Sequence, residues 1–429
     1  MRLFIVPTDV LLFRTGRPFA AGEGMMAESL FPPTPETMQG ALRALIASHW
    51  GTLEEAFQRE DVYKLIGNYQ HGGHGRFRLA SVALGRRTVK TKTVRGAPTP
   101  GSNRPGKQPA LVLPPKTQKK LTYERLFPVP AHLKPIEREG HLDFVAYLPA
   151  AQPNSATNMP DGLRPLMPKQ DEPKDGAKKK QKTTWWLTET DLLMCLRGDA
   201  KEIHGIKQNA IWTTEPRIGI GMDNARSVAE DRMLYHAAMV RMNPGRELRN
   251  PGDTWPAGDE PLYGLIVDIH LVPGDGEPEI TDADQLCQRF NKMPLRGTLA
   301  LGAERRSASY EVIVPDESSG SAVAPTAGNT SGRTLLYFAT PAYFRDGWRP
   351  KSWEDVFGIA PVAAAVPGMA RIGGWTQEPG NAGGSSKSLR RCVPAGSVYF
   401  FEGSQPERKS HYTEYGNEIG YGYTIEGVW

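Results

Sequence analysis

The sequence predicts an α+β protein made of two units, and three observations support this class. Short runs of branched and aromatic residues, typical of buried strands, recur along the 429 residues, with a few helix-like segments between them. A chain of this length can form two domains of ordinary size. The polar stretch "NPGRELRNPGDTWPAGDEP" (243–261) separates two groups of these strands. We therefore expect an N-terminal domain of residues 1–256 and a C-terminal domain of residues 257–429.

The chain begins with an apolar segment that is typical of a strand. Residues 3–6 ("LFIV") and 10–13 ("VLLF") are branched or aromatic, and Pro7 and Asp9 lie between them. We expect one buried strand with a kink at that point. Pro7 and Asp9 also interrupt the apolar run that a signal sequence needs, and no small-residue cleavage site follows. Since no run of about twenty apolar residues exists either, we expect a cytoplasmic protein.

A helix is predicted within the proline-rich stretch "SLFPPTPETMQGALR" (29–43). Thr34 can cap it, and Pro35 suits the first helical position because its missing N–H would be unpaired there. Met38 and Leu42 fall on one face of this helix, which predicts that it packs on a sheet.

A second strand–turn–helix unit is predicted over residues 215–242, "EPRIGIGMDNARSVAEDRMLYHAAMVRM". Ser227 and Glu230 have the spacing of a capping box, so a helix is expected from Val228 onward. Three later segments read as strands, namely "LYGLIVDIHLV" (262–272), "RTLLYFATPAYF" (333–344) and "GSVYFFEG" (396–403). Residues 151–182 are polar and proline-rich and read as a mobile insertion, and residues 316–333 and 376–388 as Gly/Ser-rich loops.

Positive charge is concentrated in one segment. The chain has a net charge of +5, and residues 76–134 hold fourteen Lys and Arg against a single acid, Glu124. That segment is therefore +13 and the rest of the chain −8. A segment of one sign that is rich in Gly, Pro, Thr and Ser is typical of an arm for a polyanion. The alternative is an exposed insertion that only adds solubility.

Few residues suggest catalysis. Cys195, Cys287 and Cys392 lie far apart without a CxxC pair, which argues against a disulfide framework or a zinc knuckle and for a reducing compartment. "HGGH" (71–74) could supply metal ligands, or an acid and a base that cleave RNA through its 2′-hydroxyl, although isolated loop histidines are more often surface residues. "GIG" (219–221) lacks the third glycine of a dinucleotide fingerprint. We expect no catalytic residue, no cofactor and no metal.

Arginine recurs beside glycine instead. The four instances are "FRTGRPF" (13–19), "EPRIGIG" (215–221), "GAERRSA" (302–308) and "ARIGGW" (370–375). Glycine lets a backbone N–H come close to a phosphate, and arginine adds a bidentate donor. The pattern favours anion or nucleic-acid contacts, and the alternative is a set of turns with neighbouring solvated arginines.

These segments together resemble a known family. "DVLLFRTGRPFAAGE" followed by "SLFPPTPETMQGALR" is similar to the N-terminal signature of the third Cmr subunit, a RAMP-superfamily component of the type III-B CRISPR effector in antiviral defence. Later blocks match in the same order, with Ala303 where a second glycine is usual: "EPRIGIGMDNARSVAEDRMLY", "LALGAERRSASY", "FATPAYFRDGW", "RIGGW", "RRCVPAGSVYFFEG" and "GNEIGYGYTIEGVW". The resemblance spans nearly the whole chain.

The resemblance implies two modified ferredoxin-like (RRM-like) domains with long loop insertions and no catalytic centre. It also implies a ribonucleoprotein subunit that binds the repeat-derived 5′ tag of the CRISPR RNA. Its partners would be the large polymerase-like Cmr subunit and a backbone RAMP subunit. On this basis the expected RNA-binding residues are Arg14, Arg17, Phe19, Arg217, Gly219, Gly221, Arg305, Arg306, Gly420 and Gly422.

Two other functions stay open at this point. One is a RAMP endoribonuclease that processes CRISPR RNA with His71 or His74 as acid or base. The other is a purely structural adaptor that touches protein subunits and little RNA. Whether the basic segment 76–134 contacts RNA or protein is not decided by the sequence.

Overall fold

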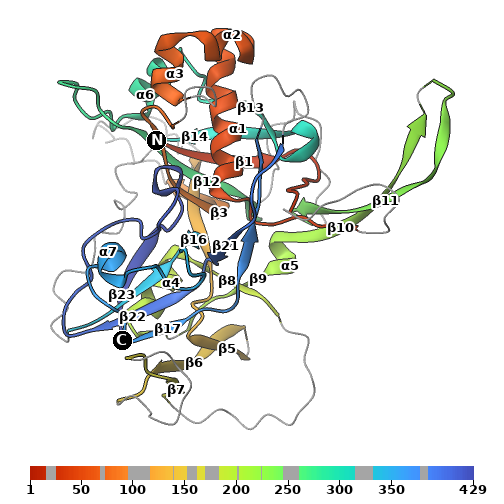
Figure 1. The fold of residues 1–429 in the computed structure, drawn as a ribbon. Helices are drawn as coiled ribbons and strands as arrows, with labels where there is room; N and C mark the ends of the chain where they lie inside the picture. The colour runs from red at the N-terminus through yellow and green to blue at the C-terminus, as the bar shows by residue number, and fades with distance from the viewer. Residues whose placement is uncertain are drawn as a thin grey trace, which may run out of the picture.

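The computed structural model describes residues 1–15, 26–67, 73–94, 116–138, 140–151, 162–169, 183–200, 202–223, 225–244, 260–314, 332–376 and 385–429. Its helices and strands confirm the predicted α+β class, with antiparallel sheets throughout the larger units. Figure 1 shows how these elements are arranged, with the N-terminal helices near the top and the strands β5, β6 and β7 near the bottom. Among the described residues, no helix has both the length and the apolar character needed to span a membrane.

The largest sheet has eight strands in the order β13-β14-β1-β12-β3-β4-β8-β9. Four adjacent strands of this sheet, β14, β1, β12 and β3, pair with one another only in antiparallel fashion. Along the chain they occur as β1, α1, β3, β12, α6 and β14, which is the βαββαβ connectivity of a ferredoxin-like unit. The bounds are β1 (Arg2–Pro7), β3 (Phe77–Val94), β4 (Lys116–Pro128), β8 (Trp185–Thr188), β9 (Ile206–Lys207), β12 (Leu262–Leu271), β13 (Arg296–Leu301), β14 (Arg306–Ile313), α1 (Pro35–Ala47) and α6 (Ala283–Arg289).

Helix α1 lies where the proline-rich stretch predicts it. The Thr34 side chain accepts a hydrogen bond from the Thr37 N–H, and Pro35 occupies the first helical position. Met38 and Leu42 are buried in one cluster with Leu3 and other residues of the sheet. Three short helical segments follow before β3, namely η1 (Ser48–Trp50), α2 (Leu53–Gln58) and α3 (Glu60–Ile66). The helices thus cover one face of the sheet and form the first core.

A second, smaller sheet has the order β17-β22-β15-β23. Its strands follow the same spatial order as the first unit, with α7 (Trp353–Phe357) as the first helix and the 3₁₀ turn η3 (Asn417–Ile419) in the place of the second. The strands are β15 (Arg333–Phe338), β17 (Ala363–Ala365), β22 (Val398–Glu402) and β23 (Thr424–Val428). β12, β15 and β22 confirm the three later strands predicted from the sequence.

The change from one sheet to the other falls between β14 and β15. Strands β12, β13 and β14 follow residue 256, where we expected the domain boundary, yet they pair with β1 and β3 of the first sheet. The predicted division therefore does not coincide with the division between sheets. Residues 245–259, which suggested it, lie outside the described part of the chain.

The two units share a hydrophobic core. Phe127 and Leu187 of the first sheet pack in one cluster with Leu335, Tyr337 and Phe400 of the second. The remaining elements are β2 (Met26–Ala27), β5 (Leu133–Arg138), β6 (His141–Pro149), β7 (Leu166–Pro168), α4 (Glu189–Leu196), α5 (Gln208–Ile211), β10 (Trp212–Asp223), β11 (Val228–Met242), η2 (Ala303–Arg305), β16 (Ala342–Tyr343), β18 (Ala370–Ile372), β19 (Trp375–Thr376), β20 (Ser385–Ser386) and β21 (Arg390–Val393).

The helix predicted after Ser227 is wrong. Residues Val228–Met242 form strand β11, which pairs with β10 along nearly its whole length as an antiparallel hairpin. The segment also pairs with β2 and, through Val240, with Leu11. Pairing to three separate parts of the chain outweighs the local helical signals. Figure 1 shows this hairpin projecting to the right of the molecule.

Candidate nucleic-acid interface

Residues 8–14 connect the main sheet to the β10–β11 hairpin. Both the N–H and the hydroxyl of Thr8 donate to the Ser307 carbonyl, at 3.1 and 2.7 Å. The N–H of Leu11 donates to the Val240 carbonyl at 2.8 Å, and the N–H of Val240 donates back to Leu11 at 2.7 Å. The Ala303 N–H donates to Leu12 at 2.8 Å. The predicted kinked strand is therefore two segments, β1 within the main sheet and residues 10–13 against β11 and η2.

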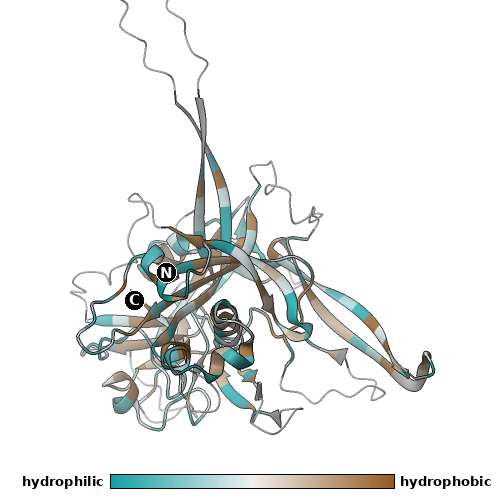
Figure 2. Ribbon diagram, turned by 90° about the horizontal axis from the view of Figure 1, so that it is seen from above, coloured by the Kyte–Doolittle hydropathy of each residue, from teal (hydrophilic) through white to brown (hydrophobic). Residues whose placement is uncertain are grey.

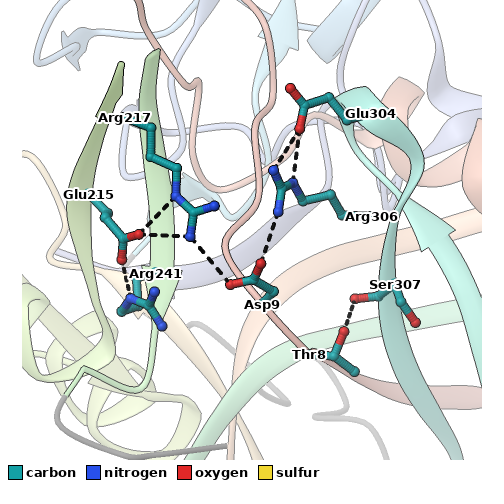
Figure 3. A network of polar contacts seen from close by, with 8 residues as sticks. All are labelled: Thr8, Asp9, Glu215, Arg217, Arg241, Glu304, Arg306 and Ser307. Carbon is teal, nitrogen blue, oxygen red and sulfur yellow. Dashed lines mark hydrogen bonds and ion pairs between the residues drawn. The ribbon is translucent and has the colours of Figure 1, made fainter. Parts of the chain in front are cut away.

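An ionic network surrounds Asp9 at the start of this connecting segment (Figure 3). One carboxylate oxygen of Asp9 lies 2.9 Å from Arg306 Nη1, and the other lies 3.8 Å from Arg217 Nη2. We call the set Asp9, Glu215, Arg217, Arg241, Glu304 and Arg306 the Asp9 cluster. It joins β10, β11, η2 and β14 through side chains that come from four distant parts of the sequence.

The outer members of the Asp9 cluster complete its ion pairs. Arg217 donates to Glu215 through Nε at 3.0 Å and pairs with it through Nη2 at 2.9 Å. Arg241 pairs with the second oxygen of Glu215, and this hydrogen bond lowers the pKa of the Glu215 carboxyl. Arg306 donates to Glu304 at 2.7 and 3.1 Å. Three carboxylates thus balance three guanidinium groups, and the cluster itself is neutral.

The turn before β14 has an unusual backbone. Gly302 has φ of +73°, and a Cβ there would lie 2.7 Å from the Leu12 carbonyl oxygen, so the position requires glycine. Glu304 and Arg305 also have positive φ, +62° and +49°. A non-glycine residue in this region costs about 1–2 kcal/mol, and such strain is often found at functional sites. The turn leaves the side chain of Arg305 exposed.

The structure brings three of the four arginine–glycine motifs together. Arg14 lies two residues beyond Leu12, and Arg305 lies two residues beyond Ala303, so both flank the hydrogen bond that joins those two residues. Both side chains are exposed, and within the described residues neither guanidinium has an ion pair or hydrogen bond. Arg14 and Arg305 therefore add two positive charges beside the neutral Asp9 cluster.

The two glycines predicted beside Arg217 have structural reasons of their own. Gly219 faces Tyr235 on the neighbouring strand, and a Cβ at this position would lie 2.2 Å from the Tyr235 ring. Gly221 lies at the irregularity where the pairing of β10 with β11 shifts between Ile220 and Met222. RNA contact at these two glycines stays a prediction.

Gly420 and Gly422 are buried against their own chain. They have φ of +91° and +71°, and a Cβ would lie 2.9 Å from the Leu79 carbonyl oxygen and 2.4 Å from the Tyr412 carbonyl oxygen, respectively. The close approach that we expected from RNA is made here by the protein backbone. RNA contact at Gly420 and Gly422 stays a prediction.

The remaining predicted residues are Arg17, Phe19 and the two histidines of "HGGH". Arg17, Phe19 and His71 lie outside the described residues. His74 is partly buried, its Nδ1 lies 3.4 Å from Gln39 Nε2, and burial lowers the pKa of its imidazole. Within the described segments, no three His, Cys, Asp or Glu side chains form a group that could hold a metal ion.

The sequence analysis missed an apolar face on the β10–β11 hairpin. Ile218 and Ile220 are 67% and 51% exposed and share one face of β10 because strand side chains alternate. Met222, beyond the irregularity in the pairing, is 46% exposed. Leu234 lies directly opposite Ile220 on β11 and is 48% exposed. Contiguous exposed apolar groups of this kind mark contact sites. The alternation over residues 216–222 is visible in the sequence, but the capping-box pattern that follows it predicts a helix as its partner.

Comparison with known proteins agrees with the resemblance read from the sequence. The model of the family described as "CRISPR-associated protein (Cas_Cmr3)" matches residues 3–99 and 110–429. The chain belongs to this family. It is therefore a subunit of the type III-B (Cmr) CRISPR effector.

Solved structures give a more distant similarity. Two matching chains come from cryo-EM structures of the Type III-B Cmr-beta, one bound to cognate target RNA and AMPPnP (state 1) and one bound to cognate target RNA. Each is 15% identical and covers 93% of this chain and 86% of its own, with TM-scores of 0.39 and 0.38. No curated protein matches the chain.

Proposed function

We propose that this Cmr-family chain is a non-catalytic subunit that holds the 5′ repeat-derived tag of the CRISPR RNA. The observation that carries the proposal is the meeting of three arginine–glycine motifs around residues 8–14. Within the part of the chain that the structure describes, the exposed Arg14 and Arg305 supply guanidinium groups without acidic partners, next to a neutral network of ion pairs. Charge-assisted, often bidentate hydrogen bonds to phosphate are the contacts that such arginines make.

The Asp9 cluster has a supporting role in this proposal. Arg306 uses three of its N–H groups on Asp9 and Glu304, so its first function is to fix the turn that presents Arg305. Arg217 similarly ties the hairpin to Asp9. These ion pairs restrain the backbone of the turn, so less backbone freedom at Arg305 is lost when RNA binds.

We further propose that the subunit joins the large polymerase-like subunit to the first backbone RAMP subunit. The apolar face of β10–β11 supports a protein contact, because Ile218, Ile220 and Leu234 are exposed on a hairpin that projects from the body of the molecule (Figure 1). A hairpin that projects from the body can reach a neighbouring subunit without moving either sheet.

The test is reconstitution of the effector with guide RNAs that carry an intact, a scrambled or a deleted tag. The proposal predicts that R14A/R305A lowers retention of the intact-tag guide and has a smaller effect on the tag-deleted guide. Equal retention of the intact-tag guide by the variant and the parent would contradict the proposal. Cleavage of repeat RNA by the pure chain, abolished by H74A, would instead favour the endoribonuclease.

A further inference from the structure

The basic segment of the chain forms a two-stranded arm. β3 pairs with β12 only up to Arg87, and β4 pairs with β8 only from Leu126 onward. Between these limits, Thr88–Val94 and Lys116–Thr122 pair only with each other among the described strands. Seven residues of strand extend about 23 Å. Figure 2 shows this hairpin leaving the body of the molecule, in a different direction from the β10–β11 hairpin.

The arm carries positive charge without any acid. Glu124, which pairs with Arg86 at 2.6 Å, is the last acidic side chain at its base. Residues 88–123 contain eight Lys and Arg and no Asp or Glu. Lys90 and Lys120 are directly opposite in the pairing of the two strands.

The arm leaves the sheet at the same end as the Asp9 cluster. One row of paired residues crosses the three strands β1, β12 and β3, namely Ile5, Leu265 and Leu84. Because β1 and β3 both run antiparallel to β12, they run in the same direction as each other. Asp9 and Thr88 both lie four residues beyond that row. Two strand spacings separate β1 from β3, which is on the order of 10 Å. A polyanion held at Arg14 and Arg305 can therefore continue to the arm.

We propose that the β3–β4 arm is a second, sequence-independent contact for the guide RNA. It would bind the part of the guide that continues beyond the nucleotides held at the Asp9 cluster. The proposal rests on the proposed function, since it needs the guide at the Asp9 cluster. Its ligand is the ribose–phosphate backbone, because lysines on a ribbon offer point charges rather than base-specific donors. The two paired strands of the arm contain five lysines, namely Lys90, Lys92, Lys116, Lys119 and Lys120.

The test compares two variants of the full chain that lose the same charge. One changes the five arm lysines to Gln, and the matched control changes five exposed lysines elsewhere to Gln, namely Lys64, Lys169, Lys207, Lys292 and Lys351. Affinity for a fluorescent guide RNA is measured from about 50 to 200 mM salt. Each phosphate contact in single-stranded RNA contributes about 0.7 to the slope of log affinity against log salt.

We expect the arm variant to lower that slope by about 3 and to weaken binding more than tenfold at the lowest salt, for intact-tag and scrambled-tag guides alike. The control should change the slope by less than one. A third variant with the five arm lysines changed to Arg should bind normally, which separates loss of charge from misfolding.

Two results would overturn the proposal. One is an arm variant with the slope of the parent. The other is an arm variant that binds guide RNA normally but no longer joins the other subunits, which would identify a protein partner. If R14A/R305A weakens binding of the tag and the arm variant does not, only the arm proposal fails. If neither R14A/R305A nor the arm variant affects guide-RNA binding, the proposed function fails as well. Adding complementary target RNA tests whether the arm contacts that strand in addition.

Discussion

Arg305 and Arg306 are adjacent in sequence but should respond to mutation in opposite ways. Arg305 is exposed and has no ion pair among the described residues, so R305A removes a phosphate donor and little else. If Arg305 makes one charge-assisted bond to the tag, its loss costs roughly 1.5–3 kcal/mol. Since about 1.4 kcal/mol is tenfold in affinity, we expect guide binding to fall roughly 10- to 100-fold, with an unchanged thermal midpoint.

Arg306 should be mainly a stability residue. Its side chain is 22% exposed and makes three hydrogen bonds to Asp9 and Glu304, which are themselves about half exposed. Solvent screening reduces the worth of such pairs, so we expect R306A to destabilise the fold by about 1–2 kcal/mol in total. The thermal midpoint should drop by roughly 2–4 °C for a unit of this size.

The assay measures the thermal midpoint of each variant and its guide-RNA affinity within the reconstituted effector. R305K is the matched control, because it keeps the charge but loses the bidentate geometry, and we expect it to lie between R305A and the parent. If R305A binds the guide normally, or if R305A and R306A destabilise the fold equally, the division of roles argued from the ion pairs is refuted.

Three further predictions concern the first arginine–glycine turn, ribonuclease activity and a buried histidine. The R14A/R17A double variant should weaken the free energy of guide-RNA binding by a few kcal/mol at most and leave the thermal midpoint unchanged. A large drop in the midpoint would show that these arginines have a structural role. The pure chain should release no product from repeat RNA, and histidine-dependent cleavage would refute this. Burial lowers the pKa of His132 from 6.5 to about 3 in the folded chain. As the pH falls, this histidine is therefore protonated in the unfolded chain before it is protonated in the folded chain. The free energy of unfolding should fall by about 1.4 kcal/mol per pH unit as the pH drops below 6.5. H132L should remove that part of the acid sensitivity in denaturant midpoints at pH 7.5 and 5.5, and an unchanged pH dependence in this variant would show that His132 does not contribute.

Local signals were sufficient for elements that local interactions determine. Thr34 and Pro35 set the start of α1 by capping and by a fixed φ, and both act within one turn of the helix. The run 262–272 is apolar enough to be a buried strand in any context, and it became β12.

Long-range pairing determined the features that the sequence did not reveal. β12 lies between β1 and β3, although residues 95–261 separate it from β3 along the chain, so the boundary expected at residue 256 follows composition rather than pairing. Residues 228–242 have helix-forming side chains, and their pairing with β10, β2 and Leu11 makes them a strand.

The candidate site shows the same division. The arginine–glycine motifs were visible in the sequence, which gave Arg217, Arg305 and Arg306 equal weight. Their ion pairs differ only because folding places Asp9 between Arg217 and Arg306 and leaves Arg305 outside. Spacing along the chain carries no information on which of two adjacent arginines meets a carboxylate 297 residues away.

The most direct test of the central claim is photo-crosslinking of the guide tag in the reconstituted effector. A guide RNA with 4-thiouridine placed singly along the tag is irradiated, and the crosslinked peptides of this chain are identified by mass spectrometry. We predict crosslinks to peptides that contain residues 8–15 or 302–306, and their loss in R14A/R305A. Tag crosslinks that map only to other subunits, or to parts of this chain remote from both segments, would contradict the claim that the Asp9 cluster and its two exposed arginines hold the tag.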